Sequence, residues 1–128
     1  ALVVCLPEPV PAGPLLQAFQ SKPQALQAAL LVWGQGALHA AKALESADWA
    51  ALGGFMNQAQ SAYEAIDLPI AHAPKLSALC VELRALGATG AKFMGAGGER
   101  SAIAVFASAQ ELEQAARELG GKGLTCVR

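Results

Sequence analysis

The chain has 128 residues, of which 54% are hydrophobic and 15% are charged, and its net charge is −1. A folded chain of this length buries roughly two thirds of its unfolded surface, and the high apolar fraction excludes an intrinsically disordered segment. The nine Lys and Arg residues form no cluster, which argues against nucleic acid or an anionic membrane as a partner. We expect one domain over residues 1–128, with apolar surface covered from outside the chain, and we expect the isolated chain to self-associate, for example as a homodimer.

The three cysteines, Cys5, Cys80 and Cys126, are odd in number, widely spaced and surrounded by apolar residues. This pattern indicates reduced, buried thiols in a cytoplasmic protein rather than a disulfide framework. No spacing typical of a metal site occurs in the sequence. The most apolar stretch, residues 25–44, is interrupted by polar residues and two glycines, which argues against a membrane span.

The first part of the chain predicts one strand followed by helices. Residues 2–6 form a continuous apolar run bounded by prolines, which is typical of a strand buried on both faces. Residues 15–19 indicate one or two helical turns. Ser21 and Gln24 have the spacing of a capping box, with a proline between them, and predict a helix that ends near Glu45. Alanines and leucines occupy nearly every face of it, so we expect this helix to be buried on most sides.

Trp33 and His39 are the residues of this helix whose side chains are best suited to a functional site. Neither has a catalytic partner nearby in the sequence. We therefore interpret Trp33 as a core residue and His39 as a partly exposed one.

The next helix carries an apolar stripe, at spacings of three and four, from Trp49 to Ile66. Ser46 or Asp48 is expected to cap it. Asn57 is suited to a hydrogen bond with a ligand, but most amides on helices are solvated, and we interpret it as a surface residue. The opposite face of this helix, which we expect to be solvated, carries Gln58, Gln60, Ser61 and Glu64.

The second part of the chain changes its pattern after one more helix. Pro74 can begin that helix, and Gly87 is a natural end for it. Residues 90–94 and 101–106 then read as two strands joined by a glycine-rich turn. The second of these strands has no charge, so we expect it to be central in a sheet.

The last elements are a helix and a strand. Ser108 and Glu111 form a second capping box, Gly120 and Gly121 are expected to stop the helix, and residues 124–127 read as a strand. The resulting order is strand, helices, strand, strand, helix, strand. This order predicts an α+β fold, a ferredoxin-like split β-α-β sheet with extra helices inserted after the first strand.

The segment from Gly87 to Phe106 holds five of the thirteen glycines of the chain. Gly95, Gly97 and Gly98 predict a sharp, exposed turn in which the backbone takes positive φ. Successive N–H groups in such a turn can converge on an anion. A plain connection between two antiparallel strands explains the same residues, and the residues alone leave both interpretations open.

One run resembles the C-terminal motif of the GHMP kinases, and most closely that of the mevalonate kinase and galactokinase-like branch. The run reads Gly90-Ala-Lys-Phe-Met-Gly-Ala-Gly-Gly98 and is followed by the apolar strand that starts at Ser101. A second segment, Leu52-Gly-Gly-Phe-Met-Asn57, also resembles the family. The departures from the usual motif, besides a Phe in place of a Leu, are Met94, Glu99, Arg100 and Ser101.

The resemblance implies an enzyme that transfers the γ-phosphoryl group of ATP, with Mg²⁺, to a hydroxyl or phosphate of a small metabolite. In that family, a Gly-Leu-Gly-Ser-Ser type loop and the catalytic Asp and Lys belong to an N-terminal domain, and no such loop occurs between Ala1 and Arg128. The first strand also begins at once after Ala1, without a preceding Met. We therefore expect the chain to be the C-terminal domain of a longer kinase, to lack catalytic residues and metal ligands of its own, and to be inactive alone.

The resemblance also implies which residues meet the phosphates or the substrate. They lie in and around the glycine-rich turn, although the carboxylate of Glu99 would repel phosphates unless Mg²⁺ or Arg100 compensates its charge. The alternative is a non-catalytic ferredoxin-like domain with a regulatory or interaction role. The expected contact residues are Lys92, Gly95, Ala96, Gly97, Gly98 and Ser101.

Overall fold

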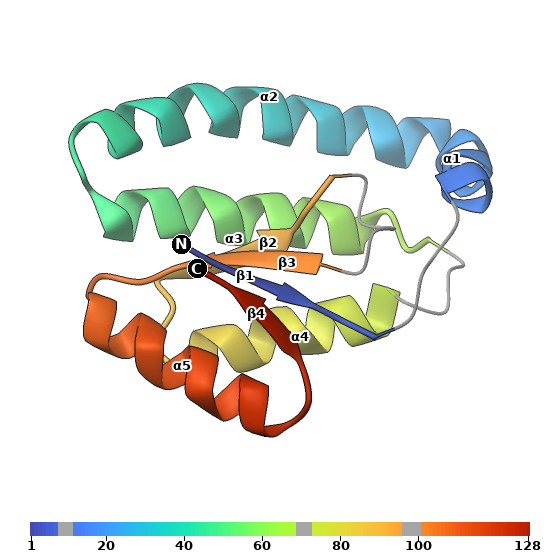
Figure 1. Cartoon of the computed structure of the whole chain (residues 1–128). Helices are drawn as coiled ribbons and strands as arrows, with labels where there is room; N and C mark the ends of the chain where they lie inside the picture. Colours follow the sequence, from blue (N-terminus) through green and yellow to red (C-terminus); the bar gives the residue numbers. More distant parts are fainter. Residues whose placement is uncertain (8–11, 69–72, 96–100) are drawn as a thin grey trace.

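A computed structural model describes residues 1–7, 12–68, 73–95 and 101–128 of the chain. Helices and strands follow one another in the order that the sequence predicts, and most boundaries agree within two residues (Figure 1). The elements are, in order, β1 (Leu2–Cys5), α1 (Ala12–Gln20), α2 (Pro23–Glu45), α3 (Trp49–Ala65), α4 (Ala73–Ala85), β2 (Gly90–Phe93), β3 (Ser101–Val105), α5 (Ala109–Gly121) and β4 (Thr125–Val127).

The four strands form one antiparallel sheet in the order β2-β3-β1-β4. The register places Val4 of β1 opposite Ala102 of β3, and Ala102 opposite Phe93 of β2. In this arrangement β1 and β2 run in the same direction with β3 between them, which is the split β-α-β connection. The predicted ferredoxin-like fold class and the inner position of β3 are therefore confirmed.

The core lies on one side of this sheet. Leu2, Val4, Ala102 and Ala104 are 0% exposed and project from the same face, because side chains two residues apart share a face of a strand. Figure 1 shows α4 and α5 on this side, whereas α3 lies beside β2 and α2 lies beyond α3. The alternate residues of β1 are only half-buried, so the prediction of a strand buried on both faces is wrong.

Helix α3 lies along the free edge of β2 and hydrogen-bonds to its backbone. The Asn57 side chain accepts a hydrogen bond from the N–H of Ala91 at 3.1 Å and donates one to the C=O of Thr89 at 3.2 Å. The Gln60 side chain accepts one from the N–H of Phe93 at 2.9 Å. An edge strand otherwise leaves such groups unpaired, and a buried unpaired N–H is costly. The prediction that Asn57 and Gln60 are solvated is wrong, since Gln60 is 1% exposed.

Two glycines allow α3 to come this close to β2. A Cβ atom added to Gly53 would lie 2.3 Å from the carbonyl carbon of Thr89, and one added to Gly90 would lie 2.2 Å from the carbonyl oxygen of Gly53. Neither distance is compatible with a side chain, and both neighbours are backbone atoms that cannot rotate away. Only glycine fits at both positions.

Two of the three predicted helix caps are confirmed. Of the two candidates for the cap of α3, Ser46 and Asp48, it is Asp48 that accepts a hydrogen bond from the N–H of Ala51. Ser108 accepts a hydrogen bond from the N–H of Glu111, which completes the capping box of α5. The capping box expected at Ser21 is wrong.

Ser21 belongs to the preceding helix instead. Its hydroxyl donates to the C=O of Ala18 at the end of α1, and Lys22 stands at the start of α2 without a side-chain cap. At the other end of the chain, α5 continues through Gly121, and the left-handed residue is Gly123 with φ of 83°. The predicted stop at Gly120 and Gly121 is therefore confirmed, although the residue with positive φ lies two positions further on.

Helix α2 is much more exposed than its sequence predicts. Only Ala29 and Ala43 are buried, while Leu31 and Leu38 are 63% and 70% exposed. The helix packs on α3 along one side, and its outer side is open in this chain (Figure 1). None of the helices in the described ranges is long and apolar enough to cross a membrane.

Replacement of Gly53 by Ala is expected to destabilise the fold by at least about 2 kcal/mol, because the added methyl overlaps the β2 backbone. Gly54→Ala is the matched control, since a Cβ there meets nothing within 4 Å and Ala is the better helix former by about 1 kcal/mol. Urea unfolding of both variants measures the difference. Equal stabilities would contradict the close α3–β2 contact.

Candidate functional site

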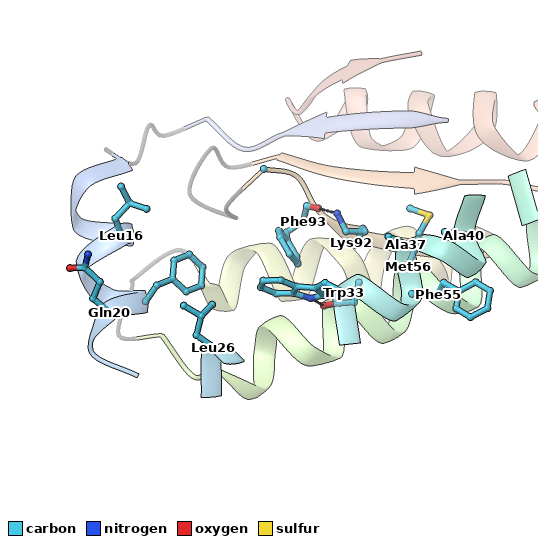
Figure 2. A pocket seen from close by; sticks show the side chains of 14 residues that line it. Leu16, Gln20, Leu26, Trp33, Ala37, Ala40, Phe55, Met56, Lys92 and Phe93 are labelled. Carbon is cyan, nitrogen blue, oxygen red and sulfur yellow. Dashed lines mark hydrogen bonds between the residues drawn. The ribbon is translucent and has the colours of Figure 1, made fainter. Parts of the chain in front are cut away.

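A cavity of about 580 Å³ lies between α1, α2, α3 and the end of β2. Figure 2 shows that side chains from all four elements point into it. Its walls are mainly apolar, and Lys92 is the one charged side chain among the described residues that line it. The wall includes Phe19, Leu26, Trp33, Met56, Lys92 and Phe93.

Trp33 forms part of the cavity wall. Its indole N–H donates to the C=O of Ala59 at 3.0 Å, which fixes the ring between α2 and α3. Its ring centre is 5.5 Å from that of Phe93, which in turn stacks on Tyr63 at 4.4 Å. The prediction of a core residue holds only in part, since Trp33 is half-buried and faces the cavity.

His39 is exposed, in agreement with its interpretation. Its ring meets Phe55 edge to face at 5.2 Å. This contact between α2 and α3 gives the imidazole a structural neighbour rather than a catalytic one.

Lys92 brings a positive charge to this apolar surrounding. Its Nζ donates to the C=O of the next residue, Phe93, at 2.6 Å and lies 4.4 Å from the centre of the Phe93 ring. Burial lowers the pKa of Lys92, because the charged form loses hydration; the nearby thiol of Cys80 opposes this only weakly. In the part of the chain that the structure describes, no carboxylate forms an ion pair with Lys92.

Gly95 lies two residues beyond the end of β2 and also lines the cavity. It is exposed and has φ of 56°, so the positive φ predicted for the glycine-rich turn is confirmed at this position. The structure thus places both Lys92 and Gly95 in the wall of this cavity. Ala96, Gly97 and Gly98, with Glu99 and Arg100, lie outside the described residues.

Ser101 takes a different place from Lys92 and Gly95. It is the first residue of β3, is 9% exposed, and pairs with Cys5 of β1. Its C=O accepts a hydrogen bond from the N–H of Met94 at 2.9 Å. Ser101 therefore belongs to the last hydrogen-bonded pair between β2 and β3 before the turn. It is not among the residues that line the cavity.

The cysteines give this site neither a nucleophile nor a metal ligand set. Burial raises the pKa of Cys80 to about 11, so its thiol is neutral at physiological pH and a poor nucleophile. All three cysteines are free, but Cys5 and Cys126 are only half-buried, which corrects the prediction that all are buried. Among the described residues, no three His, Cys, Asp or Glu side chains come together as metal ligands do.

Comparison with protein families gives one match. Residues 40–124 match the family model described as GHMP kinases C terminal. The matched region includes α3, β2 and β3. It therefore contains the α3–β2 contact and the cavity residues Lys92 and Gly95. A search of the curated proteins finds no match.

Solved structures share the fold. A Lin0012 protein from Listeria innocua is 18% identical over 100% of this chain, with a TM-score of 0.83. An L. major mevalonate kinase in complex with R-mevalonate is 24% identical over 94% of this chain, with a TM-score of 0.72. The chain spans 38% of the length of each of these two structures.

The lowered pKa of Lys92 predicts a pH-dependent contribution to stability. Between that pKa and the ordinary value of about 10.4, the unfolded chain binds more protons than the folded one, so the free energy of unfolding rises with pH in this window. Lys92→Met removes this rise. The stability of the wild type relative to Lys92→Met is thus expected to be lowest near pH 7 and to increase towards pH 10 in urea unfolding, and a constant difference would show that Lys92 is hydrated.

Proposed function

Because this chain belongs to the GHMP kinases, as their C-terminal domain, we propose that it forms the C-terminal part of an ATP-dependent small-molecule kinase. The observation that carries the proposal is the match of residues 40–124, which includes Lys92 and Gly95 in the cavity wall. ATP and Mg²⁺ are the proposed cofactors. The proposed acceptor is a hydroxyl, or a phosphate, of a small metabolite.

The glycine-rich turn would line the phosphoryl-transfer cleft. Gly95 already has the left-handed conformation in which successive backbone N–H groups converge on an anion. Gly95, Ala96, Gly97 and Gly98 are the residues proposed to approach the phosphates or the acceptor. Catalysis of phosphoryl transfer depends mostly on positioning and charge stabilisation, which backbone N–H groups supply well.

Lys92 and Ser101 have separate roles in this proposal. Lys92 supplies a cation three residues before the turn, in surroundings where the lack of a described carboxylate partner leaves its charge available to an anion. Ser101 holds the other end of the turn through the hydrogen bond from Met94. The first is a binding residue and the second a positioning residue.

The nucleotide would be held mainly by a further, N-terminal domain. The sequence contains no Gly-Leu-Gly-Ser-Ser type loop, and the two solved structures are longer than this chain. The catalytic Asp and Lys of the family would come from the same domain. On this proposal the chain alone is inactive.

A second candidate, a regulatory or interaction domain without catalysis, draws on α2. Leu30, Leu31, Leu38 and Leu44 are each more than half exposed, which is unusual for large apolar side chains and suits a protein partner. The two functions differ in a direct assay. ATP-dependent phosphorylation by the protein that carries this chain, with mevalonate as the first acceptor tried, supports the kinase.

The 128-residue chain alone is expected to bind ATP·Mg²⁺ weakly or not at all, because the nucleotide loop is absent from it. Isothermal titration calorimetry measures this directly. A micromolar dissociation constant would mean that this chain holds the nucleotide itself, and the division of roles between two domains would be wrong.

Gly95→Ala in the complete kinase is expected to lower kcat/KM at least about tenfold, because a left-handed Ala is strained by roughly 1 kcal/mol and displaces the N–H groups that meet the phosphates. Gly123→Ala is the matched control: Gly123 also has positive φ, at 83°, but follows α5. Both variants should lose similar stability in thermal unfolding. Equal kcat/KM values in the two folded variants would leave the turn with a structural role only.

A further inference from the structure

We propose that the cavity between α1, α2, α3 and β2 binds a small amphiphilic anion, a molecule with an apolar body and one acid group, and that Lys92 binds the acid group. The described residues that line the cavity come from four elements of this one chain. The proposed binding needs neither ATP nor a second domain, and it shares only Lys92 and the cavity wall with the proposed phosphoryl transfer.

The size of the cavity favours a small molecule over a protein segment. Small-molecule sites typically enclose about 300–1,000 Å³, and this cavity measures about 580 Å³. A helix with its side chains is about 10 Å wide and rises about 5.4 Å per turn, so less than two turns of a partner helix would fit.

The walls determine what the body of the ligand must be. Figure 2 shows Leu26 and Trp33 along the cavity, and Phe19 and Met56 also belong to its wall. The indole N–H of Trp33 is already occupied by the C=O of Ala59, so it offers no donor to a ligand. An apolar ligand gains from burial against these side chains, whereas a polar body would leave its hydrogen-bonding groups unpaired.

Lys92 determines what the head of the ligand must be. An ammonium group has three donors, and the one described hydrogen bond of Nζ goes to the C=O of Phe93. For the other two donors no described carboxylate is in ion-pair distance, and the described wall around Lys92 is mainly apolar, which is costly for a cation. A carboxylate or a phosphate offsets this cost, while a neutral head group does not.

The experiment compares sodium decanoate with decanol, which have the same tail and differ in the charge of the head. The native-length protein with Trp49→Phe is used, because the sequence has two tryptophans and this change leaves Trp33 as the fluorescent reporter in the chain. Decanoate, kept below its micelle concentration, should change Trp33 fluorescence saturably. Decanol should bind at least about tenfold more weakly, as expected for the loss of a charge-assisted hydrogen bond.

Three variants in the same background assign the two parts of the site. Lys92→Met should weaken decanoate to the level of decanol, while Lys42→Met, at a lysine of α2 that does not line the cavity, should leave both unchanged. Ala37→Phe, which fills the cavity from α2, should weaken both ligands. Circular dichroism on each variant establishes whether it is folded. If Lys92→Met does not fold, the Ala37→Phe variant still tests the site.

Three results would overturn the proposal. Equal affinity for decanoate and decanol would remove the role of Lys92, and so would equal effects of Lys92→Met and Lys42→Met. No saturable change with decanoate would remove the site itself. If the native-length protein binds decanoate but has no kinase activity, this result counts only against the proposed function. The binding proposal and the proposed function can therefore fail separately.

Discussion

The contact between Gly53 of α3 and Gly90 of β2 sets the distance on which the rest of the structure depends. Because no side chain separates the two backbones there, α3 runs close enough to the edge of β2 for short amides to reach it. Asn57 and Gln60 follow Gly53 by four and seven residues and so share its face of the helix. They reach the N–H groups of two alternate residues of β2, which lie on the same edge of the strand. A helix thus completes the hydrogen bonds of an edge strand without adding another strand.

The same contact creates the cavity. The α3 residues next to this face, Met56 and Ala59, turn towards α2, and the hydrogen bond from Trp33 to the C=O of Ala59 holds the two helices at their spacing. On β2, the backbones of the residues before and after Lys92 are fixed by α3, so the position of Lys92 in the strand is fixed as well. The cavity and its single described cation therefore follow from how α3 meets β2. A substitution at either glycine would shift the position of Lys92.

Local patterns in the sequence predicted what depends on neighbouring residues, and they failed where distant segments decide. The capping box of Ser108 and Glu111 needs only four residues, and it is present. Ser21 has the same spacing, but it follows the end of α1, and its hydroxyl donates to the C=O of Ala18 in that helix. Gln60 could not be recognised as buried, because its partner lies 33 residues away in β2. The alanine-rich α2 gave no periodic stripe, so its exposed side was missed, and the cavity was missed because its walls come from four separate elements.

Backbone conformation separates the glycine-rich turn from the other special positions of the fold. Left-handed residues commonly end helices, where they let the chain satisfy the last carbonyl groups. Apart from Gly95, the described residues with positive φ each lie two positions beyond the last residue of a helix: Ala47, Asp67, Gly87 and Gly123. Gly95 instead follows a strand, so the need to end a helix does not explain it. It also lies three residues after a lysine whose pKa is lowered by burial. A left-handed backbone and a poorly hydrated charge both cost stability, and their coincidence at one end of β2 favours the proposed binding site over a plain connection between two strands.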